Sequence, residues 1–289
     1  MPSIDIDRVL GYKFPPHTFT YTARDACLYA LGIGAGADPT DPAELQFVYE
    51  GFPGGFNVFP TYSVNFAFGF LPDIASIPGI DFNPMMLLHG EQLVECKQAL
   101  PPAATVTNHA AITQVYDKGS GAILIVEVTS QDEHGVDLVF NQYSVFIRGL
   151  GGFGGQRGPS GKTNLPPDRP PDVTHQETTR PDQALLYRLS GDHNPLHADP
   201  AMAAQGGFDR PILHGLCTFG FAARAVLKNF AANDSDRLKS MQARFSSHVF
   251  PGETLLTEMW DQGDGRILLR TKVVERDEVV LSNASVQLA

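Results

Sequence analysis

Apolar residues recur along this chain with two periods, and stretches rich in glycine and proline separate them. Between Gly215 and Phe230 the apolar side chains follow a helical spacing, which predicts a long helix. Alternating or continuous apolar runs predict strands at 18–21, 104–116, 122–130, 137–148, 173–178, 242–248, 254–260, 266–274 and 279–287. Many strands accompanied by few helices are typical of the α+β class.

The part of the chain before residue 90 is less regular. Thr22 can cap a helix over 23–31, and the run from Pro60 to Phe68 is predicted to be a buried helix. The stretch between these two helices contains several prolines and glycines, so we expect loops there. Residues 71–86 are apolar but contain three prolines, which predicts an ordered loop rather than a helix.

A segment rich in glycine and then in proline, residues 149–172, has the composition of a linker. It divides the chain into an N-terminal half, 1–150, a linker, 151–172, and a C-terminal half, 173–289. A G-x-G-x-x-G match at 149–154 is not a dinucleotide site, because the prolines that follow exclude the helix it requires. The two halves repeat each other in order, with 29–31 matching 187–189, 58–61 matching 212–215, 100–102 matching 250–252, and 116–119 matching 260–263.

The stretch from Tyr187 to His197 concentrates titratable side chains where the chain cannot be helical. A predicted helix over 181–189 ends at Gly191, and Pro195 disfavours the helical conformation just before it. Asp199 and Pro200 then look like the cap and first position of the next helix. Asp192 and His197 are therefore held on one short loop, and a carboxylate with an imidazole at fixed separation suits proton transfer. The alternative is a polar loop that only caps turns.

This loop, Ser190 to His197 after the aromatic Tyr187, resembles the hydratase-2 motif of the (R)-specific enoyl-CoA hydratases, the MaoC-like branch of the hot-dog fold. Residues 208–216 and 250–255 resemble two further signatures of that family. The resemblance covers nearly the whole chain and is closest to the two-domain hydratase units of peroxisomal multifunctional enzymes. It implies a double hot-dog fold, in which an antiparallel sheet wraps around a helix twice.

The activity implied by this resemblance is reversible hydration of a trans-2-enoyl-CoA to a (3R)-3-hydroxyacyl-CoA in fatty-acid metabolism. Asp192 and His197 would be the acid–base pair, in roles that the sequence leaves open. Asn194 would position water, or merely cap the loop. Gly215 begins the long helix, where backbone N–H groups are unpaired and the helix dipole is positive, so its N–H suits an oxyanion donor. The alternative for Gly215 is a plain helix-start glycine.

For coenzyme A, the resemblance implies contacts at His89, Gly90, Lys118 and Phe245. Three of these residues also have simpler interpretations. Lys118 lies in a hairpin turn, where a lysine is ordinarily solvated, Phe245 could be a core aromatic, and the repeat places His89 at the start of a strand. The resemblance implies no cofactor beyond the coenzyme A thioester that is the substrate, and no metal.

The repeat indicates which half carries the chemistry. The N-terminal half has Gly34 at the position of Asp192, Pro39 near that of His197, and Thr61 at that of Gly215, so it lacks the acid–base pair. Its extra length lies in residues 35–86 and is apolar. We expect this segment either to line a cavity for the acyl chain or to fill the core of a degenerate domain.

Composition, charge and the chain termini narrow the classes of ligand and the cell compartments expected for this protein. The net charge of −11 disfavours binding to nucleic acid, and no run of about eighteen apolar residues predicts a membrane span. Three scattered cysteines indicate a reducing compartment without disulfides or a zinc site. The N-terminus does not resemble a signal peptide, and the C-terminus is not a Ser-Lys-Leu peroxisomal address. We expect a cytoplasmic protein, with the peroxisome as the alternative in a eukaryote, and a homodimer, since closed twofold assemblies are commonest.

Two other functions share this ligand chemistry. A hot-dog acyl-CoA thioesterase would hydrolyse the thioester instead of hydrating the double bond. A non-catalytic acyl-CoA-binding protein would bind the ligand without turnover. The intact Asp192 and His197 pair favours the hydratase over both.

Overall fold

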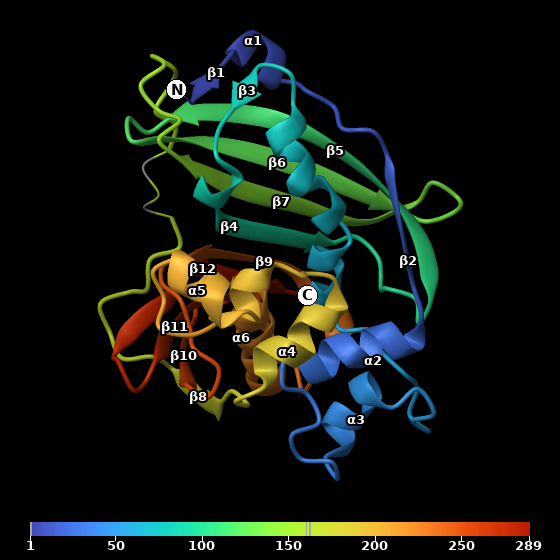
Figure 1. The fold of residues 1–289 in the computed structure, drawn as a ribbon. Coiled ribbons are helices and arrows are strands. Elements are labelled where there is room, and N and C mark those ends of the chain that lie inside the picture. The colour runs from blue at the N-terminus through green and yellow to red at the C-terminus, as the bar shows by residue number, and fades with distance from the viewer. Residues whose placement is uncertain (1, 160, 162) are drawn as a thin grey trace.

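One antiparallel sheet organises the computed structural model, which describes residues 2–159, 161 and 163–289 and has ten strands in that sheet (Figure 1). Its N-terminal half runs in the order β2 (His17–Tyr21), β5 (Ala104–Asp117), β6 (Gly121–Gln131), β7 (Asp137–Arg148) and β4 (Leu87–Cys96). It continues through β9 (Leu238–Phe245), β12 (Glu278–Leu288), β11 (Arg266–Val273), β10 (Thr254–Asp261) and β8 (Val173–Thr178). A separate pair joins β1 (Ser3–Ile4) to β3 (Ile80–Asp81).

The strand order is the same in both halves. In each half the first strand in sequence lies at the outer edge, the second lies at the centre of the sheet, and the other three lie between them in chain order. The halves meet where β4 pairs antiparallel with β9, with Leu93 opposite Gln242. The repeat seen in the sequence is therefore a repeat of the fold.

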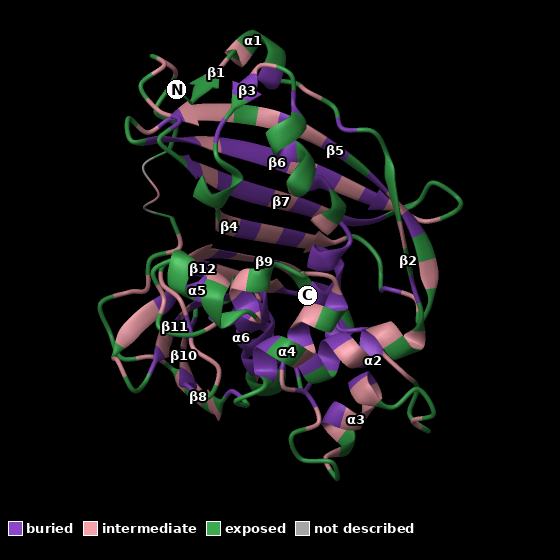
Figure 2. Ribbon diagram, viewed as in Figure 1, coloured by how far each residue is buried: buried purple, intermediate pink, exposed green. Residues whose placement is uncertain are grey.

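The helix α6 (Gly215–Phe230) is the centre of the C-terminal half, as its apolar spacing predicts. Every residue from Leu216 to Leu227 is buried, and the helix lies inside the curve of the sheet (Figure 2). Burial on all sides explains why this helix is apolar around most of its circumference.

The remaining α-helices are short. They are α1 (Ile6–Val9), α2 (Ala23–Gly32), α3 (Pro42–Val48), α4 (Gln183–Tyr187) and α5 (Pro200–Gln205). Thr22 caps α2 through a capping box with Asp25, as expected from the sequence. The repeated tyrosines Tyr29 and Tyr187 bring α2 and α4 together, with ring centroids 5.9 Å apart.

At the position of α6, the N-terminal half has only a 3-10 helix, Pro60–Asn65, and all six of its residues are buried. The predicted helix over 60–68 is therefore shorter and tighter than expected. Gly69 and Pro72 follow closely, and both residues oppose continuation of a helix. The segment predicted as an ordered loop, together with the residues just before it, forms three further 3-10 helices: Phe68–Phe70, Pro72–Ser76 and Pro84–Met86.

Most predicted strands agree with the structure to within one or two residues at each end. Three features differ. The strand predicted at 242–248 is β9, which begins at Leu238. β4 was indicated only by the repeat, which places a strand start at His89, because a bulge between His89 and Glu91 breaks its apolar alternation. The helix α3 was not predicted among prolines and glycines. Between β7 and β8 the described residues form no helix or strand. None of the described helices has the length and hydropathy needed to cross a membrane.

Candidate active site

The loop between α4 and α5 is short and held by its own hydrogen bonds. Gly191 ends the preceding 3-10 turn with a φ of 134°, a conformation that favours glycine. Asn194 Oδ1 accepts the Leu196 N–H at 3.1 Å, so the capping role weighed for Asn194 is present, although its side chain also lines the cavity described below. Asp199 Oδ1 caps α5 by accepting the Ala201 N–H at 2.8 Å. The loop is therefore as constrained as its sequence indicates.

Asp192 and His197 lie five residues apart in this loop, and His197 ends a single 3-10 turn, Pro195–His197, where the sequence predicted no helical conformation. Asp192 Oδ1 accepts the Asn194 N–H at 3.1 Å, and the carboxylate is half-buried. His197 is 8% exposed, and its Nδ1 lies 2.9 Å from the carbonyl oxygen of Ile212. Since a carbonyl only accepts hydrogen bonds, the neutral ring carries its proton on Nδ1 and leaves the Nε2 lone pair free. Burial lowers the pKa of His197, against the opposing effects of Asp192 and the Ile212 carbonyl.

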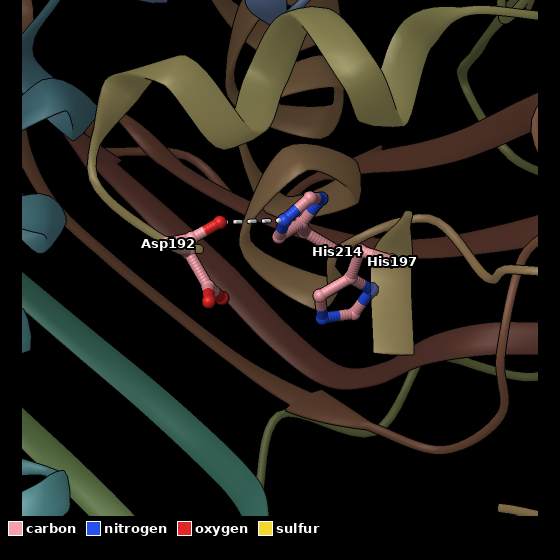
Figure 3. A group of neighbouring side chains, drawn as sticks. All are labelled: Asp192, His197 and His214. Carbon is pink, nitrogen blue, oxygen red and sulfur yellow. Dashed lines mark hydrogen bonds between the residues drawn. The ribbon is translucent and has the colours of Figure 1, made fainter. Parts of the chain in front are cut away.

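A third residue, His214, joins the pair (Figure 3). Its ring stacks on that of His197 with centroids 3.7 Å apart and an interplanar angle of 27°, and its Nε2 lies 3.2 Å from the main-chain oxygen of Asp192. Sequence reasoning did not select His214 for the site. The signal was its place in the second family signature, directly before Gly215.

These three side chains could hold a metal ion by proximity alone, since their ligand atoms lie within 4.8 Å of one another. Metal-bound imidazoles, however, direct their nitrogen lone pairs at one point. Stacked rings direct their nitrogen lone pairs side by side, and His214 Nε2 is already hydrogen-bonded to the main-chain oxygen of Asp192. The arrangement suits proton transfer better than metal ligation, and the expectation of no metal stays a prediction.

Gly215 is the first residue of α6 and its backbone is exposed to the cavity. Among the hydrogen bonds of the described residues, none uses the Gly215 N–H. A Cβ at this position would lie 3.0 Å from the Phe245 ring, a tight contact that glycine avoids. The free donor, the helix dipole and the lack of a side chain are the features that suit this position to an anion.

A cavity of about 1170 Å³ is lined by Asp192, His197 and Gly215, whereas His214 is not among its described lining residues. It brings together all but one of the residues predicted for the site: Asp192, Asn194, His197, Gly215, His89, Gly90 and Phe245. His89 and Phe245 are in edge-to-face contact, with ring centroids 4.9 Å apart, and burial lowers the pKa of His89 to about 4. Gly90 occupies the bulge between His89 and Glu91.

Lys118 is the exception, because the described residues that line the cavity do not include it. Its ammonium donates to the carbonyl oxygens of Arg157 and Pro159. Lys118 nevertheless lies at the same end of the sheet as the cavity residue Arg148, because Arg148 pairs with Gly121, which follows the turn that contains Lys118. The sequence analysis did not select Arg148.

The apolar segment of the N-terminal half both lines the cavity and fills a core. Phe68, Leu71 and Phe82 line the cavity, together with Asn65. Phe70, Ile74, Ile77 and Ile80 are buried in a hydrophobic cluster on β5, β6 and β7. Met85, near the end of the apolar segment 35–86, is 54% exposed and is not among the lining residues of the described structure.

Comparison with known proteins finds two family models that together cover most of the chain. Residues 19–149 match the MFE-2 hydratase 2 N-terminal domain, and residues 162–284 match the MaoC like domain. The chain is 45% identical to "Probable enoyl-CoA hydratase 2" of Dictyostelium discoideum, over 97% of this chain and 95% of that protein. It is 46% identical to the mouse "Peroxisomal multifunctional enzyme type 2", over 96% of this chain but 38% of that protein.

Solved structures agree. A MaoC-like dehydratase from Phytophthora capsici superposes with a TM-score of 0.88 at 38% identity, covering 99% of this chain and 98% of that one. A Mycobacterium tuberculosis protein described as having a double hotdog fold matches with a TM-score of 0.59 at 15% identity, covering 98% of this chain and 96% of that one, which supports the fold alone.

Proposed function

The chain belongs to the MaoC-like hydratase-2 family and is a hydro-lyase of enoyl-CoA, and we propose that it adds water reversibly across trans-2-enoyl-CoA to give the (3R)-3-hydroxyacyl-CoA. One observation supports this reaction most directly. Asp192, the free Nε2 side of His197 and the unpaired Gly215 N–H all face one cavity with apolar walls.

In this proposal His197 Nε2 accepts a proton from the water that attacks C3. Its Nδ1–H is held by Ile212, so the correct tautomer is fixed before substrate arrives. Burial lowers the pKa of His197 and keeps the ring neutral near pH 7, as a base must be. Asp192 shares the same water and, with His197, returns one proton to C2. One water is thus added, and the pair ends as it began.

Negative charge develops on the thioester oxygen as water attacks. The Gly215 N–H at the start of α6 is placed to receive it, because the donor is free and the helix dipole is positive there. A preorganised donor stabilises the enolate-like state more than the substrate ground state, which is the condition for rate acceleration.

The cavity also suits the rest of the ligand. His89, Gly90 and Phe245 would contact the thioester end of coenzyme A, while Lys118 and Arg148 at the same end of the sheet would attract its phosphates. The acyl chain would extend between Leu71 and Phe82 of the N-terminal half.

The decisive experiment follows the loss of enoyl absorbance when protein is added to crotonyl-CoA and trans-2-decenoyl-CoA, with chiral analysis of the product. A 3R alcohol supports the proposal, and a 3S alcohol contradicts it. Release of free thiol would indicate the thioesterase instead, and binding without any turnover would indicate an acyl-CoA-binding protein. Because burial lowers the pKa of His197, the ring should stay neutral through the ordinary histidine pKa of about 6.5, and the rate should fall only at lower pH.

Assembly and compartment are part of the proposal. We expect a homodimer, which light scattering at several protein concentrations would test. The sequence favours the cytoplasm, whereas the Arabidopsis thaliana relative, 44% identical over 96% of this chain and 93% of that protein, is named peroxisomal. Imaging of the native protein with antibodies in its own cell would distinguish the two compartments.

A further inference from the structure

We propose that His214 is a positioning residue that sets both members of the acid–base pair at once, holding the Asp192 main chain by a hydrogen bond and the His197 ring by stacking. The inference rests on the proposed function. It concerns a residue that touches neither water nor thioester in that mechanism but contacts both groups that do.

The first contact fixes Asp192. The main-chain oxygen of Asp192 can only accept, so His214 Nε2 must carry a proton and donate to it across 3.2 Å. His214 is 1% exposed, and burial together with the adjacent His197 keeps its pKa well below the usual range, so the ring is neutral. The hydrogen bond reaches across 22 residues of sequence and ties the start of the loop to the start of α6.

This arrangement has a cost that a purely structural residue would avoid. In the neutral ring with a proton on Nε2, Nδ1 is an acceptor, and it is buried without a partner among the described residues. A buried acceptor without a partner is destabilising, so its presence calls for a physical explanation. His214 also precedes α6 as its N-cap, yet its side chain makes no capping hydrogen bond within the described structure. The side chain is directed to the catalytic loop instead.

The second contact fixes His197. Its Nδ1 is anchored to Ile212, which still allows the ring to rotate about that hydrogen bond. The flat contact with His214, 3.7 Å between centroids, removes this freedom and excludes water from one face of the ring. The charged and titratable groups around the two rings are Asp192, His193, Arg188 and the buried Tyr187, whose ring centroid is 4.9 Å from that of His214. Gly215 follows His214 directly in the chain, so His214 contacts both Asp192 and His197 and is bonded to the residue that carries the proposed oxyanion donor.

Two substitutions separate the contacts. His214→Phe keeps a flat ring against His197 but loses the donor to Asp192, whereas His214→Gln keeps an N–H donor but loses the stack. The control is Cys217→Ala, which removes a buried side chain three residues later on the same helix, away from the described cavity lining. All four proteins are assayed with crotonyl-CoA and trans-2-decenoyl-CoA across pH.

Each His214 variant should lose at least about tenfold in kcat with little change in KM, because a small misplacement of reacting groups is costly while binding surfaces are intact. In His214→Gln the acidic limb of the pH profile should also move to higher pH, since water reaching His197 relieves the burial that lowers its pKa. His214→Phe should keep that limb in place. Cys217→Ala should match the wild type in kcat, KM and pH profile.

A second readout does not depend on activity. The Hε1 resonance of His197, assigned by its absence in His197→Gln, should show a ring-current shift in the wild type and in His214→Phe and lose it in His214→Gln. Three outcomes would each overturn the inference. They are a wild-type kcat in both His214 variants, a loss of kcat in Cys217→Ala equal to theirs, and a His197 resonance with the same chemical shift in His214→Gln as in the wild type. A wild type that hydrates no enoyl-CoA but shows the ring-current pattern would reject the proposed function and leave the positioning contact standing.

Discussion

The two halves of this protein have the same sheet and different centres. In the C-terminal half a helix of 16 residues, Gly215–Phe230, lies inside the sheet, and in the N-terminal half six residues of 3-10 helix, Pro60–Asn65, take its place. The strand order is identical in both. The sheet therefore builds the frame in either half, while the chemistry depends on what occupies the centre, since only a full helix supplies a strong dipole and a row of free N–H groups at its start.

Two of the three positions that match the proposed catalytic groups are packed against other residues in the N-terminal half. Thr61, the match of Gly215, is fully buried and hydrogen-bonded to Tyr29 Oη at 2.8 Å. A Cβ at Gly34, the match of Asp192, would lie 2.5 Å from the Phe221 ring, so no larger residue fits there. Pro39, the match of His197, lies on the surface. This half supplies a cavity wall and a core instead of a second site.

The largest expected effect comes from the ion pair that joins the halves. Glu44 of α3 lies 2.8 Å from Arg224 of α6, and both side chains are buried. Glu44→Ala leaves the guanidinium without one of its two carboxylates, so the free energy of unfolding should fall by about 3 kcal/mol in urea denaturation. Glu133→Ala, at an exposed carboxylate, should change it by less than about 0.5 kcal/mol. Equal effects would mean that the junction does not depend on this pair.

Next come the catalytic groups themselves. Asp192→Asn and His197→Gln should each lower kcat by at least about a hundredfold, the usual scale of general acid–base catalysis. The matched change in the other half, Pro39→Ala, should leave kcat unaltered because that position carries no chemistry. Steady-state kinetics with crotonyl-CoA measures all three. Near-normal turnover in either catalytic variant would remove that residue from the mechanism.

A smaller effect tests the cavity wall that the N-terminal half provides. Each acyl methylene buried between Leu71 and Phe82 should contribute up to about 0.8 kcal/mol, so KM should fall more than about tenfold from four to ten carbons. Leu71→Trp should lower kcat/KM for decenoyl-CoA about tenfold and spare crotonyl-CoA. The exposed Met85→Trp is the control and should affect neither substrate. A KM independent of chain length would leave this half with a structural role only.

The smallest effect distinguishes Thr61 from Gly215, the two positions that match each other at the centres of the two halves. Thr61→Ala removes the hydrogen bond to Tyr29 and should lower the free energy of unfolding by about 1 kcal/mol without changing kcat. Gly215→Ala brings a methyl group against the Phe245 ring and should lower kcat with little change in stability. Thermal denaturation and initial rates distinguish the two, and a loss of kcat in Thr61→Ala would show that the halves share the chemistry.

The sequence by itself determined what depends on neighbours along the chain. Apolar periodicity gave α6 and most strands to within a residue or two, and Gly191 with Pro195 indicated the stiff loop that carries Asp192 and His197. It also predicted a compositional linker and the repeat of elements. These features arise from local propensity, turn chemistry and hydrophobic patterning, all of which are written in short windows of sequence.

Only the tertiary structure decided which distant residues meet. His214 stacks on His197 across 17 residues. Asn65 and Leu71 of the N-terminal half line one cavity together with residues of the C-terminal half, and Met85 and Lys118 lie outside its described lining. The bulge at Gly90, which appears only in the pairing of β4 with β7, likewise was not predicted. Contacts between residues far apart in sequence follow from how the layers fit together, and no local pattern records that fit.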